Sequence, residues 1–286
     1  MFLPRKILEE KLKQLLAEDV GQGDVTTAAI VPERQTVDAS IIAKESGTVA
    51  GIEEILILAE ALGLEGEAYI SDGGKIERGQ AFLKVSGDAQ TILSAERMML
   101  NLLSRMSGIA TATKRLVEKL QEARMVTKVA ATRKSAPGLL YFDKKAVLLG
   151  GGDPHRLHLD DTILIKDNHI TVVGSVEAAV KKAKQNASFT KKIEVEVTNV
   201  ADALTAAKAG TDIIMLDNFS PKQVKQAVET FKKAGFFGKV LLEASGGITE
   251  ATLVEYASAG VDVLSLGELT HSVRALDISL EVTRVC

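Results

Sequence analysis

The chain has 286 residues, of which 46% are apolar, 26% are charged and 4% are aromatic, and its net charge is −3. This length allows one large domain or two ordinary ones, and the weakly acidic, Trp-free composition does not predict a nucleic-acid-binding surface. No stretch of 18 uncharged apolar residues predicts a membrane span. One cysteine, Cys286, excludes an internal disulfide and a cysteine-based zinc site, and the charged N-terminal segment is unlike a signal peptide, so we expect a cytoplasmic protein.

The first hundred residues predict a mixed α+β domain. Three segments show helical periodicity of their apolar residues. One segment alternates between apolar and polar residues, as a half-buried strand does, and another has turn residues between short alternating runs, as hairpins do. The predicted elements are helices over 5–17, 51–62 and 89–122, the last with a break at Ser107-Gly108, a polar loop over 18–27, a strand over 37–46 and hairpins over 66–87. The hairpin rhythm also occurs in biotinyl and lipoyl modules, but the modifiable lysine setting of those modules is missing, which favours structural β-hairpins.

From about Val126 to Gly267, short apolar segments recur at nearly even spacing, and each ends in a charged residue or a glycine loop. Ala/Lys/Val-rich stretches of helical period separate the last four segments. This alternation predicts parallel βα units, whose polar strand ends converge on one edge of a barrel or open sheet, where ligands bind. We place the domain boundary near residue 108 and expect the tail after His271 to return to the first domain.

Three cation-bearing segments follow predicted strands or glycine loops. Arg133 and Lys134 end the first strand, Lys166 ends the second, and a glycine-rich loop supplies Arg156 together with His155. Arg and Lys together suit a carboxylate or phosphate, and His155 can donate to the same anion.

Other roles remain open for the same residues. A basic dipeptide can be a solvated surface, Lys166 can be a salt-bridge partner, and His155 can ligate a metal ion with His158 and Asp160 or Asp161. The position of the cations at strand ends favours an anionic ligand. The neighbouring residues Asp167 and His169 are expected to hold the loop.

Carboxylates and glycine loops occupy the later strand ends. Glu194 and Glu196 share one face of a strand, with Glu196 nearer the edge, and Asp217 ends a later strand. Two carboxylates facing several cations suit a polyanionic, Mg²⁺-bound sugar phosphate. The last two strand units end in Ser245-Gly246-Gly247 and in Gly267, as in barrels that cradle a phosphate with backbone N–H groups. Neither a P-loop nor a Rossmann motif is present.

The motifs together resemble one family, the quinolinate phosphoribosyltransferases. The resemblance spans almost the whole chain and rests on GDVTT, AERMMLNLLSRMSGIAT, ATRKSAPGLL, GGGDPHRLHLDDTILIKDNHI, IEVEV, IIMLDN, LEASGGI and LSLGELTHS. It implies an α/β protein with an N-terminal α+β sandwich domain, residues 1–107 joined by the tail 272–286, followed by an incomplete TIM-like α/β barrel, residues 108–271. It also implies a homodimer or a multiple of dimers that uses Mg²⁺, and that converts quinolinate and phosphoribosyl pyrophosphate (PRPP) into nicotinate mononucleotide, pyrophosphate and CO₂ in NAD biosynthesis.

The resemblance also assigns roles to individual residues. It implies that Lys134 meets the pyrophosphoryl group and that Glu196 and Asp217 hold the ribose hydroxyls and Mg²⁺. The remaining residues are expected to bind substrate. The quinolinate carboxylates are bound by Arg105 from the neighbouring subunit and by Arg133, His155, Arg156 and Lys166. The phosphates are bound by Ser245, Gly246, Gly247, Gly267 and His271. The loop GGGDPHR differs from the GGxxNHR common in the family, but the His-Arg pair is kept.

Three other functions are weighed against this one. A molybdenum-transport-associated relative shares the TRK and HR motifs but lacks the Lys166–His169 segment. A nicotinate phosphoribosyltransferase needs to neutralise one carboxylate, whereas this chain supplies at least four cations and a histidine. A non-catalytic sugar-phosphate-binding barrel does not need Glu196 and Asp217 beside its phosphate loops.

Overall fold

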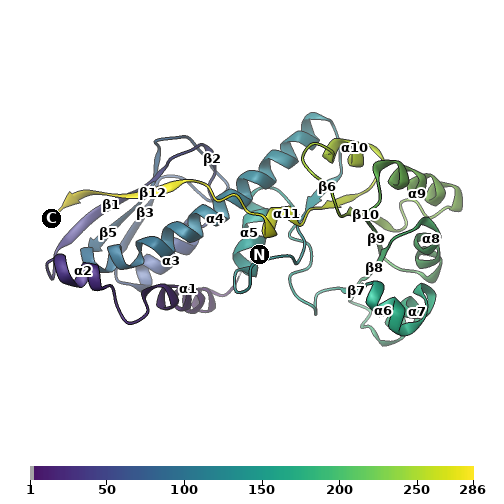
Figure 1. The fold of residues 1–286 in the computed structure, drawn as a ribbon, viewed down its shortest axis with the longest axis horizontal. Coiled ribbons are helices and arrows are strands. Elements are labelled where there is room, and N and C mark those ends of the chain that lie inside the picture. The colour runs from purple at the N-terminus through teal and green to yellow at the C-terminus, as the bar shows by residue number, and fades with distance from the viewer. Residues whose placement is uncertain (1–2) are drawn as a thin grey trace. The chain divides into compact units, whose positions relative to one another are not determined.

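The computed structural model describes residues 3–286, which divide into two compact units (Figure 1). The first unit contains the described residues up to Ala112, with Leu148–Gly150 and Val273–Cys286, and the second contains Thr113–Val147 and Gly151–Ser272. The sequence places this division at 107/108 and 271/272. In the structure it falls inside helix α4 (Ala89–Glu122), because that helix runs without interruption from one unit into the other.

The first unit is built on a four-stranded antiparallel sheet in the order β12-β1-β5-β3. The C-terminal strand β12 pairs with β1, so the tail of the chain forms an edge of the first unit's sheet (Figure 1). Apolar side chains from β1 and β5 pack with those of α3 and α4 in a buried core cluster. The elements of this unit are α1 (Arg5–Val20), α2 (Val25–Ile30), β1 (Thr36–Ala43), β2 (Gly47–Thr48), α3 (Ile52–Ala61), β3 (Glu65–Ala68), β4 (Lys75–Ile76), β5 (Ala81–Asp88), the first part of α4, and β12 (Ile278–Val285).

The predicted break at Ser107-Gly108 is wrong, because both residues make tertiary contacts inside a continuous helix. The Ser107 hydroxyl is buried, accepts the Ala50 N–H at 3.0 Å and donates to the Ala50 carbonyl at 3.3 Å. A Cβ on Gly108 would lie 2.2 Å from the Arg274 carbonyl oxygen. Glycine is therefore required here by the close approach of the C-terminal tail, and it does not end the helix.

Two further predictions for the first unit need correction. The segment 18–27 is not all loop, since α1 extends to Val20 and α2 begins at Val25, where the Asp24 carboxylate accepts the Thr27 N–H at 3.0 Å as an N-cap. The segment 66–87 is not a simple series of hairpins. Strand β3 pairs with β5, but β4 pairs with β2 instead.

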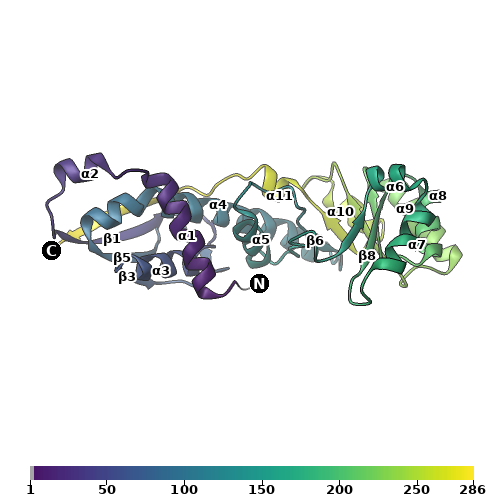
Figure 2. The ribbon, with the colours of Figure 1, turned by 90° about the horizontal axis from the view of Figure 1, so that it is seen from below.

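The second unit contains a six-stranded parallel sheet in the order β6-β11-β10-β9-β8-β7. Strands β6 and β7 lie at its two edges and do not pair with each other, so the barrel is not closed. This incomplete α/β barrel confirms the predicted fold class. Figures 1 and 2 both show α7, α8 and α9 on one face of the sheet. The elements are the end of α4, β6 (Lys128–Ala130), α5 (Leu140–Leu149), β7 (Ile163–Ile165), α6 (Asp167–Val173), α7 (Val176–Asn186), β8 (Ile193–Val197), α8 (Val200–Ala209), β9 (Ile213–Asp217), α9 (Pro221–Ala234), β10 (Leu241–Ser245), α10 (Leu253–Ser258), β11 (Val263–Ser265) and α11 (Glu268–His271).

Local sequence explains why the βα units end where they do. The central strands β8, β9 and β10 are buried over most of their length, as expected for parallel strands covered on both faces. Helix α9 begins with a capping box between Ser220 and Gln223, with Pro221 in its first turn, and ends at Gly235 with φ +73°. Because α9 begins only at its cap, a short polar segment separates the carboxyl end of β9 from the helix, and it lies at one edge of the sheet.

Within residues 3–286, the structure contains no helix that is both long enough and apolar enough to cross a membrane.

Candidate active site

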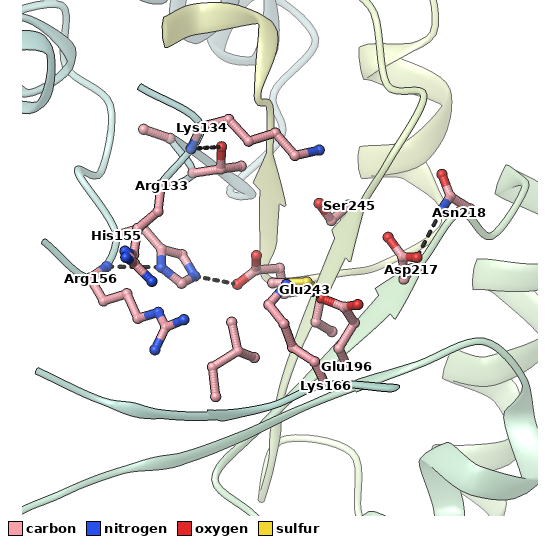
Figure 3. Close-up of a pocket in the computed structure, with 14 residues that line it drawn as sticks. Arg133, Lys134, His155, Arg156, Lys166, Glu196, Asp217, Asn218, Glu243 and Ser245 are labelled. Carbon is pink, nitrogen blue, oxygen red and sulfur yellow. Dashed lines mark hydrogen bonds and ion pairs between the residues drawn. The ribbon is translucent and has the colours of Figure 1, made fainter. Parts of the chain in front are cut away.

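A pocket of about 470 Å³ lies at the carboxyl ends of the parallel strands of the second unit (Figure 3). Successive strand ends each contribute side chains, so residues distant in sequence meet there. Cations come from the segments after β6 and β7 and from the loop before β7, and carboxylates come from β8, β9 and β10. The lining residues are Ala131, Thr132, Arg133, Lys134, His155, Arg156, Leu164, Lys166, Glu196, Met215, Asp217, Asn218, Glu243 and Ser245.

Lys166 and Glu196 form an ion pair within the pocket, with 2.7 Å between Nζ and Oε2 (Figure 3). The Glu196 side chain is 16% exposed and the Lys166 side chain 44%, so solvent still reaches the cation. The segment after Lys166 is not the predicted loop but the start of helix α6, and His169 Nδ1 in its first turn accepts the Lys166 backbone N–H at 2.9 Å. An incoming anion must therefore share Lys166 with Glu196 or displace it from Glu196.

Asp217 lies at the end of the neighbouring strand β9. Burial and the negative charge of Glu196 raise the pKa of Asp217 above its ordinary value. The side-chain amide of Asn218 donates to Asp217 Oδ2 at 2.8 Å, and its backbone N–H donates to the Ser245 carbonyl at 2.8 Å. Asn218, with φ +57°, thus connects the carboxylate of β9 to the glycine loop after β10.

A buried cluster of His155, Glu194 and Glu243 adjoins the pocket. His155 Nδ1 accepts the Arg156 N–H at 2.8 Å, so the ring proton lies on Nε2, which is 3.2 Å from Glu243 Oε2 and 3.7 Å from Glu194 Oε2. In this arrangement the imidazole donates to Glu243, and a direct bond from His155 to a substrate carboxylate stays a prediction. Sequence reasoning missed Glu243. Its signal was a charged residue in an apolar strand, two positions before Ser245 and hence on the same face.

The pKa values in this cluster follow from burial and from the two carboxylates. Glu194 is fully buried and accepts no hydrogen bond from the described residues. Burial and the nearby charge of Glu243 raise the pKa of Glu194 to about 7. Burial alone would lower the pKa of His155, but the hydrogen bond and charge of Glu243, with the charge of Glu194, raise it above its ordinary value.

The raised pKa of Glu194 predicts a pH-dependent loss of stability. The Glu194 carboxyl keeps its proton more tightly in the folded state, so its contribution is complete below pH 4.5 and is lost as the pH rises through about 7. Glu194→Gln cannot ionise, so it does not lose this contribution. The stability of Glu194→Gln minus that of the wild type should therefore be larger at pH 8 than at pH 5, by on the order of 1–3 kcal/mol. Thermal denaturation at both pH values measures this difference. Glu229→Gln, on the exposed face of α9, is the control, and an equal difference at both pH values for Glu194→Gln would contradict the prediction.

The glycine loops lie beside this edge of the sheet. Gly246 has φ +91°, and a Cβ there would lie 2.2 Å from the Asn218 side-chain oxygen. A Cβ on Gly267 would lie 3.0 Å from the His271 ring and 3.1 Å from Lys134 Cδ, so these three residues are grouped together. Neither position has room for a Cβ, so the packing of Asn218, His271 and Lys134 around the two loops requires glycine at both.

Most of the predicted site residues are brought together by the fold. Eight of them line the pocket: Arg133, Lys134, His155, Arg156, Lys166, Glu196, Asp217 and Ser245. Gly267 lies beside Lys134 and the His271 ring, and Gly246 and Gly247 directly follow Ser245. Arg105 lies on the part of α4 that belongs to the first unit, so its place relative to this pocket stays a prediction.

The alternative metal set of His155, His158, Asp160 and Asp161 is not what the fold assembles. Asp161 instead accepts the backbone N–H groups of Leu157 and His158, at 2.6 and 3.0 Å. The potential ligand atoms nearest to His155 are those of Glu194 and Glu243, all within 4.8 Å of one another. Arg156 and Lys166 act on the Glu194 carboxylate of this cluster electrostatically.

Comparisons with known proteins agree with this geometry. Residues 24–107 match the family described as "Quinolinate phosphoribosyl transferase, N-terminal domain", and residues 109–281 match the corresponding C-terminal domain. The chain belongs to the quinolinate phosphoribosyltransferase family.

Relatives in this family cover nearly the whole chain. The "Probable nicotinate-nucleotide pyrophosphorylase [carboxylating]" of Methanocaldococcus jannaschii is 47% identical over 96% of this chain and 96% of its own length. The protein of the same name from Methanothermobacter thermautotrophicus is 43% identical over 95% and 97%. Among solved quinolinate phosphoribosyltransferase-like structures, NadC from Streptococcus pyogenes is 38% identical, with a TM-score of 0.88 over 100% of this chain and 99% of its own. Human nicotinic acid phosphoribosyltransferase, 14% identical with a TM-score of 0.63, shares the fold alone.

Proposed function

We propose that this chain transfers the phosphoribosyl group of PRPP to quinolinate with loss of CO₂, and so makes nicotinate mononucleotide and pyrophosphate for NAD biosynthesis in the cytoplasm. One observation carries the proposal: a single pocket sets the cations Arg133, Arg156 and Lys166 against the carboxylates Glu196 and Asp217. The cations suit the two carboxylates of the acid. The carboxylates suit the ribose hydroxyls and the positive charge that develops on the ribose ring.

The residues act mainly through orientation and charge. Arg133, Arg156 and Lys166 hold the acid so that its ring nitrogen meets C1 of the ribose as pyrophosphate leaves. Glu196 and Asp217 stabilise the oxocarbenium-like state, and Lys134 stabilises the departing pyrophosphate. The ring nitrogen is then positively charged and stabilises the electron pair that the broken C–CO₂ bond leaves on C2, where a proton from water then takes the place of the lost CO₂. No acid–base residue is required for the C–C bond itself to break.

The donor set of Glu196 and Asp217 suits Mg²⁺ that arrives with PRPP. Lys166 binds Oε2 of Glu196 and Asn218 binds Oδ2 of Asp217, which leaves the second oxygen of each carboxylate for coordination. Two carboxylates are too few to surround Mg²⁺ alone, but they are enough when pyrophosphate oxygens and water complete the shell. Bound there, Mg²⁺ would neutralise charge on the pyrophosphate.

Product analysis tests the proposed function. The protein is incubated with quinolinate, PRPP and Mg²⁺, and the products are separated by chromatography. We expect nicotinate mononucleotide to accumulate only when all three are present. A protein that binds PRPP but forms no nucleotide would instead be the non-catalytic sugar-phosphate-binding barrel.

Separate variants should distinguish the two halves of the pocket. Arg133→Ala or Lys166→Ala should weaken quinolinate binding by about 2–5 kcal/mol, because each leaves a carboxylate of the bound acid without its cation, and should change PRPP binding less. Gly247→Val should do the reverse, since Gly247 has φ +64° in the proposed phosphate loop. Calorimetric titration of each ligand measures both affinities. Equal losses for both ligands in every variant would mean that the subsites are misassigned.

We further propose that the chain forms a homodimer, or a multiple of dimers, in which Arg105 completes the partner's site. In a two-fold symmetric dimer, one interface then creates two composite sites. Arg105→Ala alone and Lys134→Ala alone should each be nearly inactive.

Mixing these two variants tests the shared site. After they are refolded together, about half of the molecules are mixed dimers, each with one intact site and one doubly defective site, so activity should recover to about a quarter of wild type. Native mass spectrometry of a tagged variant confirms subunit exchange. Activity no higher than that of the two parents, despite confirmed exchange, would show that Arg105 does not act across the interface.

A further inference from the structure

Helix α5 carries two adjacent charged side chains, Asp143 and Lys144, that are fully buried and do not line the pocket. A fully buried lysine is unusual, because its charge loses hydration that only close polar partners can replace. Burial lowers the pKa of Lys144 to about 8. Nothing in the proposed chemistry uses this lysine, so its burial calls for a separate explanation.

The partners of Lys144 are backbone carbonyls in the loop that carries His155 and Arg156. Its Nζ donates to the Pro154 carbonyl and, at 3.3 Å, to the Arg156 carbonyl. These two carbonyls lie on either side of His155, whose φ of +55° is rare for a residue other than glycine. Lys144 thus ties down the backbone of a loop whose conformation is locally unfavourable.

Asp143 makes the equivalent contact with the other cation segment. Its Oδ2 accepts the Ser135 hydroxyl at 2.9 Å, and Ser135 directly follows Arg133 and Lys134. Two neighbouring residues of one helix therefore contact the two segments that supply the pocket with Arg133, Lys134, His155 and Arg156.

We propose that Lys144 is a positioning residue for the dicarboxylate substrate, which fixes the loop of His155 and Arg156 through the carbonyls of Pro154 and Arg156. This inference rests on the proposed function, since it concerns the acid-binding half of that pocket. Lys144 does not touch the substrate. It acts by holding the Arg156 guanidinium where a carboxylate can meet it, so its loss should affect quinolinate far more than PRPP.

The charges around Lys144 make its effect sensitive to pH. The carboxylates of Asp143 and Asp153 favour the protonated amine, whereas Arg133, Arg156 and His155 disfavour it. As the pH rises through about 8, the ammonium loses its proton and its charge-assisted bonds to the two carbonyls weaken. The acid-binding loop should therefore loosen over the same interval.

The decisive variant is Lys144→Met, which keeps an unbranched side chain only one atom shorter and removes the donor and the charge. Calorimetry at pH 7 should show quinolinate binding weakened by about 10–100-fold, the range for losing hydrogen bonds from a charged group, and PRPP binding weakened by less than about threefold. Lys144→Gln, which keeps a donor, should fall between the two proteins. Lys225→Met, on the exposed face of α9, removes the same charge elsewhere in this unit and should leave both affinities unchanged.

The pH dependence separates positioning from simple structural support. Quinolinate affinity of the wild type should fall between pH 7 and pH 9, and the fall should be smaller in Lys144→Met, while the remaining groups titrate alike in both. Unchanged quinolinate binding in Lys144→Met, or a parallel loss of both affinities and of Tm, would overturn the inference. If Lys144→Met does not fold, Lys144→Gln is read by the same criteria. If the wild type fails to bind quinolinate, the proposed function itself is wrong, and this inference falls with it.

Discussion

Quinolinate should be turned over with a kcat/KM up to about 10⁴-fold higher than that of nicotinate. The pocket gathers Arg133, Arg156 and Lys166 beside one another, and nicotinate would leave at least one of these cations without an anionic partner. A polar site rejects an analogue that strands a buried charged group far more strongly than an apolar site rejects a missing methylene. Initial rates with each acid, at saturating PRPP and Mg²⁺, measure the ratio.

A variant of the acid-binding half provides the control for this preference. Lys166→Ala should lower kcat/KM for quinolinate more than for nicotinate, and so narrow the ratio, whereas Lys225→Met should leave it unchanged. Comparable kcat/KM values for the two acids in the wild type would favour a nicotinate phosphoribosyltransferase. Turnover of neither acid would favour the molybdenum-transport-associated relative.

Glu196→Ala should lower kcat by about 10²–10³-fold, the usual loss when one group that stabilises transition-state charge is removed. Quinolinate affinity should not fall to match, because Lys166 forms a 2.7 Å ion pair with Glu196 and becomes free to bind a substrate carboxylate when Glu196 is lost. Steady-state kinetics with quinolinate as the varied substrate separate the two effects.

The companion variant is Glu196→Gln, which keeps the size of the side chain and removes its charge. It should lose nearly as much kcat as Glu196→Ala, because the proposed role is electrostatic. An unchanged kcat with only a raised KM for quinolinate, in either variant, would assign Glu196 to acid binding and not to the developing charge on the ribose.

The sequence predicts the second unit well because its signals are local. Short buried strands end in polar residues at regular spacing, and this spacing alone is enough to place Arg133, Lys166, Glu196 and Asp217 at one edge of the sheet. Parallel strands align their carboxyl ends, which converts spacing along the chain into proximity in space. The cap residues of α9 likewise lie within a few positions of the ends they stabilise.

Features that depend on distant backbone were not predictable in the same way. Gly108 suggests a helix break when only its neighbours are considered, and it is explained by the approach of Arg274 from the far end of the chain. Strand β4 follows an apparent hairpin turn, yet it pairs with β2. In both cases a tertiary contact outweighs the local preference.

The missing parts of the site are buried charges whose partners come from other elements. Glu243 is recognised only through its contact with His155, and Lys144 only through its bonds to the carbonyls of Pro154 and Arg156. A charge within an apolar run indicates that a partner is needed, but it does not indicate which residue supplies it. That information comes only from the folded arrangement.

Release of CO₂ together with pyrophosphate tests the central claim most directly. Quinolinate labelled in the carboxyl group next to the ring nitrogen on C2 is supplied with PRPP and Mg²⁺, and labelled CO₂, pyrophosphate and nicotinate mononucleotide are measured in the same reaction. The account predicts that the three products form in equal amounts and that no CO₂ is released without PRPP. Pyrophosphate release without labelled CO₂, or CO₂ release that does not require PRPP, would contradict it.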